Sequence, residues 1–536
     1  MFYVTSENIL FIGSILIFCS ILVSRASSRF GIPALLLFLV VGMLFGSDGL
    51  GIVFDDVNKA NFLGMVALCV ILFTGGMETK ISDIRPVLSP GLALSTLGVL
   101  LTAAVTGGFI FFMNGWKGVG LGLPLVSCLL LAATMSSTDS ATVFAMLRGK
   151  NMRLKNNLQP MLELESGSND PMAYIITVVL IEIATTMSSG AGLEPEASAE
   201  AAHAAGFATA ASYTTYMTVW NAIKVFLLQF IVGGAVGAGI GYATVWLLNK
   251  VQLNNTPLYA IMLLSIVFFA YSLAGMLSGN GYLAVYIAGI LIGNSKFNHR
   301  KQILAFLDGL TWMMQIGMFL LLGLLVNPVQ MLRTAPAAML IGVFMMLVAR
   351  PLPGFGCLLP FRNISPKSKL FVSWVGLKGA TPIIFATYPI LSHIEGGEGI
   401  FNIVFFITLM SLVVQGSTLP LAAKWLKLND DSAVQDKEFD VDLPEEAGDL
   451  TETTLTEEMV KDMAAAGGTA LKDLSLPDGV RVLMIKRNGK FIVPTGTTEL
   501  CTGDHLLIIS ESTEDLGRLS QAGSAGADEQ KRGEVL

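Results

Sequence analysis

The sequence predicts an all-α polytopic membrane protein of about 13 transmembrane helices, followed by a small α+β domain. Its composition is the first observation: 53% of the 536 residues are hydrophobic, only 14% are charged, and the mean hydropathy is +0.67. These values lie outside the range of soluble globular proteins. The second observation is that short polar interruptions break three of the apolar runs. The third is that the composition turns acidic and polar after Leu428.

We interpret thirteen apolar runs as helical spans, taking about 20 residues for each. They lie near 7–24, 32–47, 60–78, 87–113, 121–147, 158–187, 219–249, 257–278, 281–294, 303–326, 334–350, 369–390 and 400–426. The first run does not fit a secretory signal, because no basic residue precedes it, it carries Glu7, and another apolar run follows at once. We therefore expect it to be retained as a helix.

Lysine and arginine residues gather in every second connection between these runs. They are Arg25, Arg29, Lys80, Arg85, Arg148, Lys150, Arg153, Lys155, Lys250, Lys296, Arg300, Lys301, Arg362, Lys367, Lys369, Lys424 and Lys427. The intervening connections hold few, chiefly Lys59, Lys117 and Arg333. By the positive-inside rule the N-terminus lies outside and the C-terminus is cytoplasmic. This orientation requires an odd number of spans, which agrees with thirteen.

Cysteine and histidine do not form a metal or redox pattern. The five cysteines, Cys19, Cys69, Cys128, Cys357 and Cys501, are scattered and read as small core residues. The four histidines, His203, His299, His393 and His505, lie outside the apolar centres, so a histidine proton relay in the membrane has no support.

The C-terminal part of the chain divides into three segments. Residues 429–450 form an acidic linker, 451–520 a small cytoplasmic domain, and 521–536 a tail of Gly, Ala and charged residues that we expect to be disordered. Within the domain, two alternating runs flank Asn488-Gly489, which is a strong hairpin signal, and "DHLLIIS" supplies a third strand. A helix is expected before them in "TEEMVKDMAAA".

The stretch "MLELESGSNDPMAY" places three carboxylates between apolar runs. On a helix, Ser166 and Asp170 share one face, and Glu165 and Asn169 share a face about 100° away. A charged Asp at a helix centre costs about 2.5–3.5 kcal/mol on insertion scales, so it requires a partner. A monovalent cation or a proton could supply that partner.

Proline at position 171 adds an oxygen to this region, because it cannot donate to the carbonyl of Gly167. The alternative is that the stretch is a loop at a span end, where its acids are simply solvated. The apolar runs on both sides leave room for one long span only if the acids lie inside it. Glu163 is read as a residue at the cytoplasmic end of that span.

Two further interruptions accompany this one. Ser136 to Ser140 break the preceding span with short polar side chains, which favour local unwinding. Gly376, Gly379 and Pro382 bracket Lys378 and Thr381 in the second-to-last span. The alternative for these glycines is close helix packing. Paired broken helices in the two halves of a chain indicate an inverted-repeat secondary transporter with an ion site near the midplane.

Four motifs, in this order, resemble the hallmark motifs of NhaP-type monovalent cation/proton antiporters, of the cation:proton antiporter-1 family. They are "STDSA" from Ser137, "ESGSND" from Glu165, "VAR" ending at Arg350, and "GLKGA" from Gly376. The resemblance covers nearly all of residues 1–428. It implies two inverted six-helix repeats, crossed broken helices, a separate dimerisation domain and an elevator-like movement.

The resemblance also implies roles for individual residues. Asp170 matches the carboxylate that binds the proton or the cation, and Asn169 matches the neutral partner found in the electroneutral subgroup. Ser166 and the backbone of Thr138 match cation-ligating oxygens, which Asp139 accompanies.

Six further positions are assigned in the same way. Glu165 and Arg350 match a buried ion pair that braces the core; the alternative for Arg350 is snorkelling at a span end. Lys378 and Thr381, with Gly376 and Gly379, form the broken-helix crossing. The full set of assigned positions is Asp170, Asn169, Ser166, Thr138, Asp139, Glu165, Arg350, Lys378, Gly376, Gly379 and Thr381.

The sequence departs from the family pattern at two positions. Lys378 stands where Arg is common; it keeps the positive charge but lacks the forked geometry of Arg. Thr74 stands where many relatives carry an acid, so one ligand found in them is missing here. Glu78 lies near the cytoplasmic end and does not replace it.

The C-terminal domain resembles the TrkA-C-like half of domains that regulate potassium conductance. This implies a cytoplasmic regulatory module, usually dimeric, that binds a nucleotide or another small molecule. Together the resemblances favour an electroneutral, homodimeric K⁺/H⁺ antiporter of a bacterial inner membrane, with no cofactor and no nucleic-acid partner. Na⁺/H⁺ exchange is the second hypothesis.

A ligand-gated cation channel is the alternative of another class. The sequence contains no run resembling TVGYG and has far more spans than a pore subunit needs. A membrane enzyme is disfavoured, because the intramembrane acids lack an accompanying His, Cys or metal motif.

Overall fold

The computed structural model contains two compact units, Met1–Asp431 and Ser432–Leu536. The described residues are 2–3, 8–30, 33–116, 118–148, 152, 154–188, 210–251, 255–297, 299–429, 449–455, 460–461, 469–473, 480–487 and 489–510. The linker segment 430–448 and the tail from 511 onward lie outside them, as do Lys117, Lys150 and Arg153.

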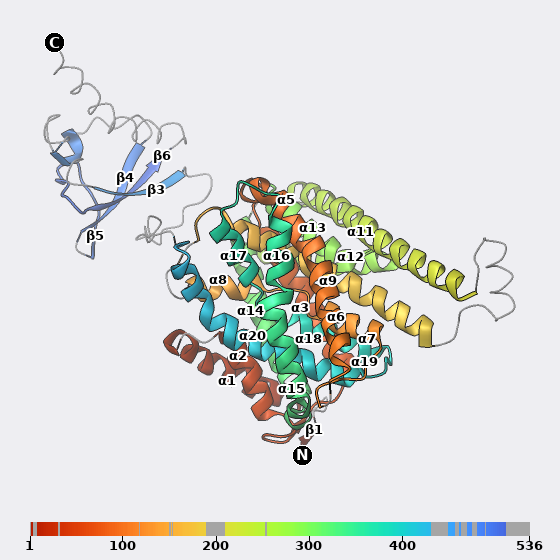
Figure 1. The fold of residues 1–536 in the computed structure, drawn as a ribbon. Helices are drawn as coiled ribbons and strands as arrows, with labels where there is room; N and C mark the ends of the chain where they lie inside the picture. The colour runs from red at the N-terminus through yellow and green to blue at the C-terminus, as the bar shows by residue number, and fades with distance from the viewer. Residues whose placement is uncertain are drawn as a thin grey trace, which may run out of the picture. The chain divides into compact units, whose positions relative to one another are not determined.

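The first unit is helical almost throughout (Figure 1). Up to the first polar interruption its helices are α1 Ile9–Phe30, α2 Ala34–Phe45, α3 Val57–Glu78, α4 Ile81–Ile84, the 3₁₀ turn η1 Arg85–Val87, α5 Leu88–Ala93, the π-helical η2 Leu94–Gly98, α6 Val99–Met113 and α7 Leu125–Thr134. Strands β1 Phe2–Tyr3 and β2 Ile52–Val53 pair in parallel beside them.

The remaining helices of this unit continue in chain order. They are α8 Ser140–Arg148, α9 Leu158–Ser188, α11 Ala210–Lys250, α12 Thr256–Met276, α13 Gly281–Gly293, α14 Arg300–Leu325, α15 Pro328–Phe344, the π-helical η3 Met345–Ala349, α16 Pro351–Leu358, α17 Pro366–Trp374, α18 Thr381–Phe385, α19 Thr387–Leu391 and α20 Gly397–Trp425.

The apolar helices correspond one to one with the thirteen predicted spans. Among the described residues, eight helices are long and apolar enough to cross a membrane, and five shorter apolar helices accompany them. The shorter ones include Leu125–Thr134 and Thr381–Leu391, which belong to the two spans predicted to unwind. The predicted fold class, an all-α polytopic membrane protein with a small strand-containing domain, is confirmed.

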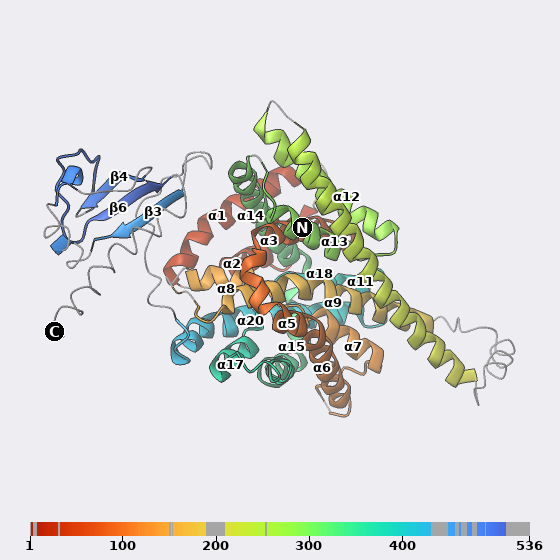
Figure 2. The same cartoon turned by 90° about the horizontal axis from the view of Figure 1, so that it is seen from above.

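Helix contacts divide the first unit into two bundles. The scaffold bundle comprises α1–α3 and α11–α14, where α13 packs closely on α3 and α11. The core bundle comprises α5–α9 and α15–α20. In Figure 2, α12, α13 and α14 lie on one side of α9, and α6, α15 and α17 lie on the other. Glycines allow the tight α3–α13 contact: a Cβ on Gly76 would lie 2.7 Å from the carbonyl oxygen of Tyr286.

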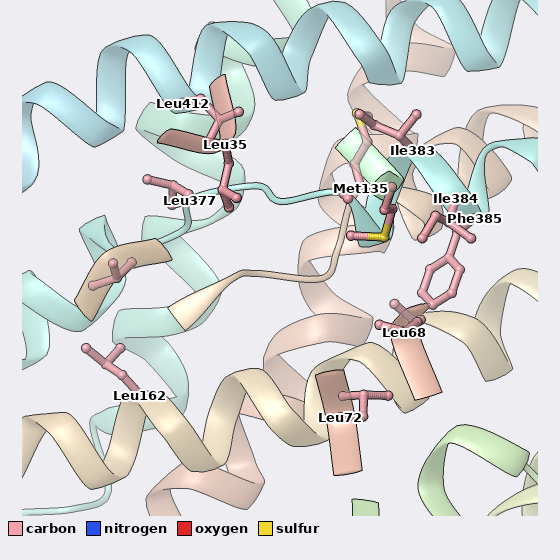
Figure 3. Packing of buried hydrophobic residues seen from close by; sticks show 14 of the residues in the cluster. Leu35, Leu68, Leu72, Met135, Leu162, Leu377, Ile383, Ile384, Phe385 and Leu412 are labelled. Carbon is pink, nitrogen blue, oxygen red and sulfur yellow. The ribbon is translucent and has the colours of Figure 1, made fainter. Parts of the chain in front are cut away.

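Two non-helical stretches meet inside the core bundle. Residues 135–139 separate α7 from α8, and residues 375–380 separate α17 from α18. The backbone N–H of Asp139 donates to the carbonyl of Leu377 (2.8 Å), which joins the two stretches directly. Met135 and Leu377 belong to one buried hydrophobic cluster (Figure 3). The unwinding expected from short polar side chains and glycines is therefore present in both spans.

The second unit contains a four-stranded antiparallel sheet in the order β3-β6-β4-β5. Its strands are β3 Asp449–Thr454, β4 Val480–Arg487, β5 Lys490–Ile492 and β6 His505–Ser510, with the 3₁₀ turn η6 Leu471–Asp473 beside them. The β4–β5 hairpin and β6 match the three predicted strands. Within the range predicted as a helix, the structure describes only Val460 and Lys461, which are helical.

Strand β3 corrects the predicted boundary between linker and domain. The linker was expected to reach residue 450, but the strand begins at Asp449 and pairs with Ser510. Its sequence, "DLTETT", is polar and lacks hydrophobic alternation, because it is an edge strand of the sheet.

Candidate functional site

Asp170 lies inside α9, a continuous helix of 31 residues. The acidic stretch is therefore helical rather than a loop at a span end. Asp170 is 8% exposed, and its neighbours Glu165 and Asn169 are 1% and 0% exposed. The predicted arrangement of two polar faces on one helix brings all three residues to the crossing of the non-helical stretches.

Two hydroxyl groups hold the Asp170 carboxylate, one from the non-helical stretch 135–139 and one from Thr381, the first residue of α18. Ser137 donates to one carboxylate oxygen in a short hydrogen bond, and Thr381 donates to the other at 3.2 Å. The connection between α7 and α8 thus contributes one donor to the Asp170 side chain, and α18 contributes the other. Hydroxyl and carboxylate oxygens are hard ligands, which alkali cations prefer.

Ser166 and Asn169 connect α9 to Thr138. The Ser166 hydroxyl donates to the carbonyl of Thr138 (2.9 Å) and accepts from the backbone N–H of Ser140 (3.0 Å). The Asn169 amide donates to the Thr138 hydroxyl (2.6 Å). The buried Oδ1 of Asn169 makes no hydrogen bond to any described residue. It is therefore an oxygen that remains available beside Asp170.

Asp139 serves as the N-cap of α8. Its carboxylate accepts from the backbone N–H of Thr142 (3.1 Å) and from the Thr142 hydroxyl (2.6 Å). Capping of this kind satisfies a backbone donor that the start of a helix otherwise leaves unpaired. The carboxylate also packs on Gly379, where a Cβ would overlap it. In this structure the Asp139 carboxylate therefore braces the start of α8 against Gly379, and its role in cation binding remains a prediction.

Glu165 and Arg350 form an ion pair that is almost fully buried, with side-chain exposures of 1% and 3%. Arg350 lies between the π-helical η3 and α16, and it also donates to the carbonyl of Val375 (3.1 Å). A Cβ on Gly376 would lie 2.8 Å from the Arg350 Cγ. Arg350 is therefore inside the core bundle and does not snorkel at a span end.

Lys378 ties the two non-helical stretches together. Its ammonium group donates to the carbonyl of Ser137 (2.8 Å), and its side chain is buried. Its backbone N–H donates to the hydroxyl of Ser411 (3.0 Å), which in turn donates to Gln415 (2.6 Å). Gln415 reaches back to the carbonyl of Trp374 (3.1 Å). The segment from 374 to 378 is held in its extended form by this clamp on α20.

The sequence did not identify several of these partners. Ser137 was recognised only as part of the polar interruption, although it contacts Asp170 directly. Ser411 and Gln415 lie in an ordinary apolar span, and only their spacing of four residues hints at a shared face. Thr74 bonds to the carbonyl of Val70 and accepts from Thr311, away from these contacts.

Along α9, the Leu158 side of Asp170 is more exposed than the Ser188 side. Ser166, Gly167 and Ser168, on the Leu158 side of Asp170, are partly exposed, whereas residues 171–173 on the Ser188 side are buried. On that buried side Tyr174 packs edge-on against Tyr282 (5.0 Å between ring centroids). The structure is therefore closed on the Ser188 side of Asp170.

Two family models match this chain. Residues 14–425 match the family model described as "Sodium/hydrogen exchanger, transmembrane". Residues 455–515 match the TrkA-C domain model. The first match covers the whole site described above.

Among characterised relatives, the K(+)/H(+) antiporter NhaP2 of Shewanella baltica is 37% identical over 518 residues, which is 95% of this chain and 83% of that protein. The K(+)/H(+) antiporter NhaP of Alkalimonas amylolytica is 40% identical over 78% of this chain and 67% of its own length. The sodium proton antiporter MjNhaP1 from Methanocaldococcus jannaschii has a similar fold, with a TM-score of 0.62, 22% identity, and coverage of 77% of this chain and 99% of that one.

Proposed function

Because the chain belongs to the sodium/hydrogen exchanger family and is a cation/proton antiporter of the NhaP type, we propose that it exchanges one K⁺ for one H⁺ at Asp170 without moving net charge. The observation that carries this proposal is the Asp170 carboxylate itself. It is buried in a membrane-spanning helix and held by the hydroxyls of Ser137, in the first non-helical stretch, and Thr381, at the start of α18. An intramembrane carboxylate in such a setting requires a proton or a cation as its partner.

The proposed cycle is a competition for this one carboxylate. When Asp170 is ionised, a dehydrated cation binds to its oxygens, to the hydroxyl of Ser166 and to the backbone of Thr138. The hydroxyls of Ser137 and Thr381 rotate to present lone pairs, because a hydroxyl both donates and accepts. The unpaired Oδ1 of Asn169 supplies another oxygen. When Asp170 is protonated the site is neutral, so carrying either partner leaves the same net charge.

Potassium is the favoured cation, since two relatives at 37% and 40% identity are named K(+)/H(+) antiporters. Sodium is the second candidate. It is supported by the Na(+)/H(+) antiporter NhaS2 of Synechocystis, which is 26% identical over 432 residues. Hydroxyl, amide and carboxylate oxygens accept either ion, so the ligand chemistry alone does not choose between them.

We further propose how the two bundles move and how the C-terminal domain regulates exchange. The core bundle moves against the scaffold bundle in an elevator-like step, as a homodimer in a bacterial inner membrane. The positive-inside rule favours a cytoplasmic position for the Leu158 end of α9, because the connection before it is rich in basic residues. The TrkA-C domain is then cytoplasmic and regulates exchange by binding a small molecule such as a nucleotide.

The test is exchange in proteoliposomes. Wild type and Asp170→Asn are compared for proton efflux on addition of K⁺, Na⁺ or Li⁺, with the membrane potential clamped and then free. We expect wild-type exchange that prefers K⁺ and ignores the clamp, and at least a hundredfold loss in Asp170→Asn, since the variant can bind neither partner.

Asp308→Asn is the matched control, because Asp308 is an exposed aspartate on α14, away from the crossing. It should exchange like wild type. Exchange that survives Asp170→Asn would refute the site, and flux that follows the membrane potential would refute electroneutral antiport.

A further inference from the structure

Tyr286 on α13 of the scaffold bundle packs directly on α9 of the core bundle. The contact is at Gly167, where a Cβ would overlap both the Tyr286 ring and its hydroxyl. Only glycine allows this approach. Gly167 and Asp170 are three residues apart, so they share one face of the helix. The Tyr286 hydroxyl therefore lies one turn from the carboxylate, on the more exposed Leu158 side of Asp170.

The hydroxyl of Tyr286 is buried beside the hydroxyls of Thr79 and Ser168 but has no hydrogen bond of good geometry among the described residues. The residue is 3% exposed, and its hydroxyl makes no hydrogen bond to any residue that the structure describes. Its polar neighbours include Ser168 and Thr79, and it interacts electrostatically with both Glu163 and Asp170. A buried hydroxyl without a hydrogen bond destabilises the folded protein. A ligand that binds transiently would satisfy this hydroxyl.

A second oxygen at the same place is also without its usual donor. In a helix the carbonyl of Gly167 would accept from the backbone N–H of residue 171, but that residue is proline. The Tyr286 hydroxyl and the Gly167 carbonyl therefore both lie at Gly167. Both are oxygens of the kind that replace water around an alkali cation.

These two oxygens lie between the partly exposed residues of α9 and the buried Asp170. Glu163, Ser166, Gly167 and Ser168 are partly exposed, whereas Asp170 is buried. Glu163 and Asp170 are seven residues apart, two helical turns along one face. A cation moving from the Leu158 end of α9 toward Asp170 passes Gly167.

We propose that the Tyr286 hydroxyl, the Gly167 carbonyl and the Ser168 hydroxyl form a second cation subsite between Glu163 and Asp170. It binds a partly dehydrated monovalent cation before transfer to Asp170. Because Tyr286 belongs to the scaffold bundle and the other two belong to the core bundle, the ion is held between them. This inference rests on the proposed function, and its test is designed to separate the two.

The first test is Tyr286→Phe, which removes one oxygen and leaves the ring. Cation-dependent exchange is measured in everted membrane vesicles, where the cytoplasmic face is accessible. Loss of one hydrogen-bonding or ligating group predicts a rise of about 2- to 10-fold in the KM for K⁺, with an unchanged maximal rate. The ratio of KM values for K⁺, Na⁺ and Li⁺ should also change, since each ion is dehydrated to a different extent.

Tyr242→Phe is the matched control, because Tyr242 is 68% exposed on α11. It removes the same atom far from α9 and should leave every KM unchanged. A merely structural role for Tyr286 would lower the maximal rate equally for all three cations and leave the ion selectivity unaltered.

A second variant tests the same subsite in case Tyr286→Phe folds poorly. Ser168→Ala removes another ligand of the same subsite and should raise the KM in the same direction. The double variant should be less than additive, because both changes remove one binding site. Thermal stabilisation of the purified protein by KCl gives an independent readout, since it depends on cation affinity rather than on transport.

The outcomes are distinct. If wild type exchanges cations for protons but Tyr286→Phe matches it in KM, selectivity and stabilisation by KCl, the subsite is refuted and the proposed function stands. If wild type shows no exchange at all, the proposed function itself fails. Additive effects of Tyr286→Phe and Ser168→Ala would also overturn a shared subsite.

Discussion

At the scale of single residues, the second unit offers a well-defined ion pair. Arg487 on β4 donates to both carboxylate oxygens of Asp504, at 2.8 and 2.7 Å, and to the carbonyl of Glu499. Asp504 is buried, which opposes its ionisation. The hydrogen bonds from Arg487 and from the backbone N–H of Cys501 outweigh that effect, so the pKa of Asp504 lies below its usual value.

This lowered pKa sets the sign of a pH prediction. An aspartate that is easier to ionise when folded contributes stability fully above its unfolded pKa of about 3.9, and loses it as the pH falls through the lower folded value. Asp504→Asn should therefore destabilise the sheet at pH 7, by about 1–3 kcal/mol. At pH values below the lowered folded pKa of Asp504, the variant and wild type should converge.

Hydrogen exchange of the β4 and β6 peptides in the full-length protein measures this effect across the pH range, after correction for intrinsic rates. Peptides of α9 in the same samples serve as the internal control and should not respond. Equal protection of wild type and variant at pH 7 would show that the ion pair does not stabilise the sheet.

At the scale of elements, the non-helical stretch before α18 depends on α20. The hydroxyl of Ser411 accepts from the backbone N–H of Lys378, and its removal leaves that donor buried without a partner. Ser411→Ala should cost about 1–3 kcal/mol and slow exchange. The measurements are the melting temperature in detergent and the exchange rate.

Ser417→Ala tests the same change on the same helix. Ser417 bonds only to carbonyls of its own helix and faces outward. It should leave both the melting temperature and the exchange rate unaltered. An equal loss in the two variants would mean that Ser411 matters for α20 alone and does not hold the crossing.

The elements of the crossing could be predicted from the sequence because their signals are local. Ser136 to Ser140 and Gly376 to Gly379 break apolar runs within a few residues, and Glu165, Ser166, Asn169 and Asp170 repeat at helical spacing. The contacts between distant segments carry no such signal. Ser411, Tyr286 and Asn280 stand in apolar or turn sequences that fit ordinary packing, and β3 was missed because an edge strand needs no hydrophobic alternation.

At the scale of the whole molecule, one of the contacts between the two bundles is a corner on the Ser188 side of Asp170, formed by Asn280 on α13 and Pro171 on α9. Asn280, fully buried, caps α13 by accepting from the backbone N–H of Leu283 (2.9 Å). Its amide donates to the carbonyl of Pro171 (3.0 Å), the residue that follows Asp170. Behind it, Tyr282 reaches the hydroxyl of Tyr388 (3.4 Å). If the core bundle moves against the scaffold bundle, this corner must open.

The hydrogen bond from Asn280 should then stabilise the state that is closed on this side. Asn280→Ser keeps an N-cap oxygen for α13 but lacks the amide that reaches Pro171. Its loss should shift the equilibrium between the two states by about 2- to 10-fold. The apparent affinity for K⁺ should therefore fall on the cytoplasmic face and rise on the opposite face, measured in everted and right-side-out vesicles. Asn327→Ser, the same exchange at the cap of α15, should change neither value. A parallel fall on both faces of Asn280→Ser would indicate general damage and would contradict a latch between the bundles, because only a shifted conformational equilibrium moves the two affinities in opposite directions.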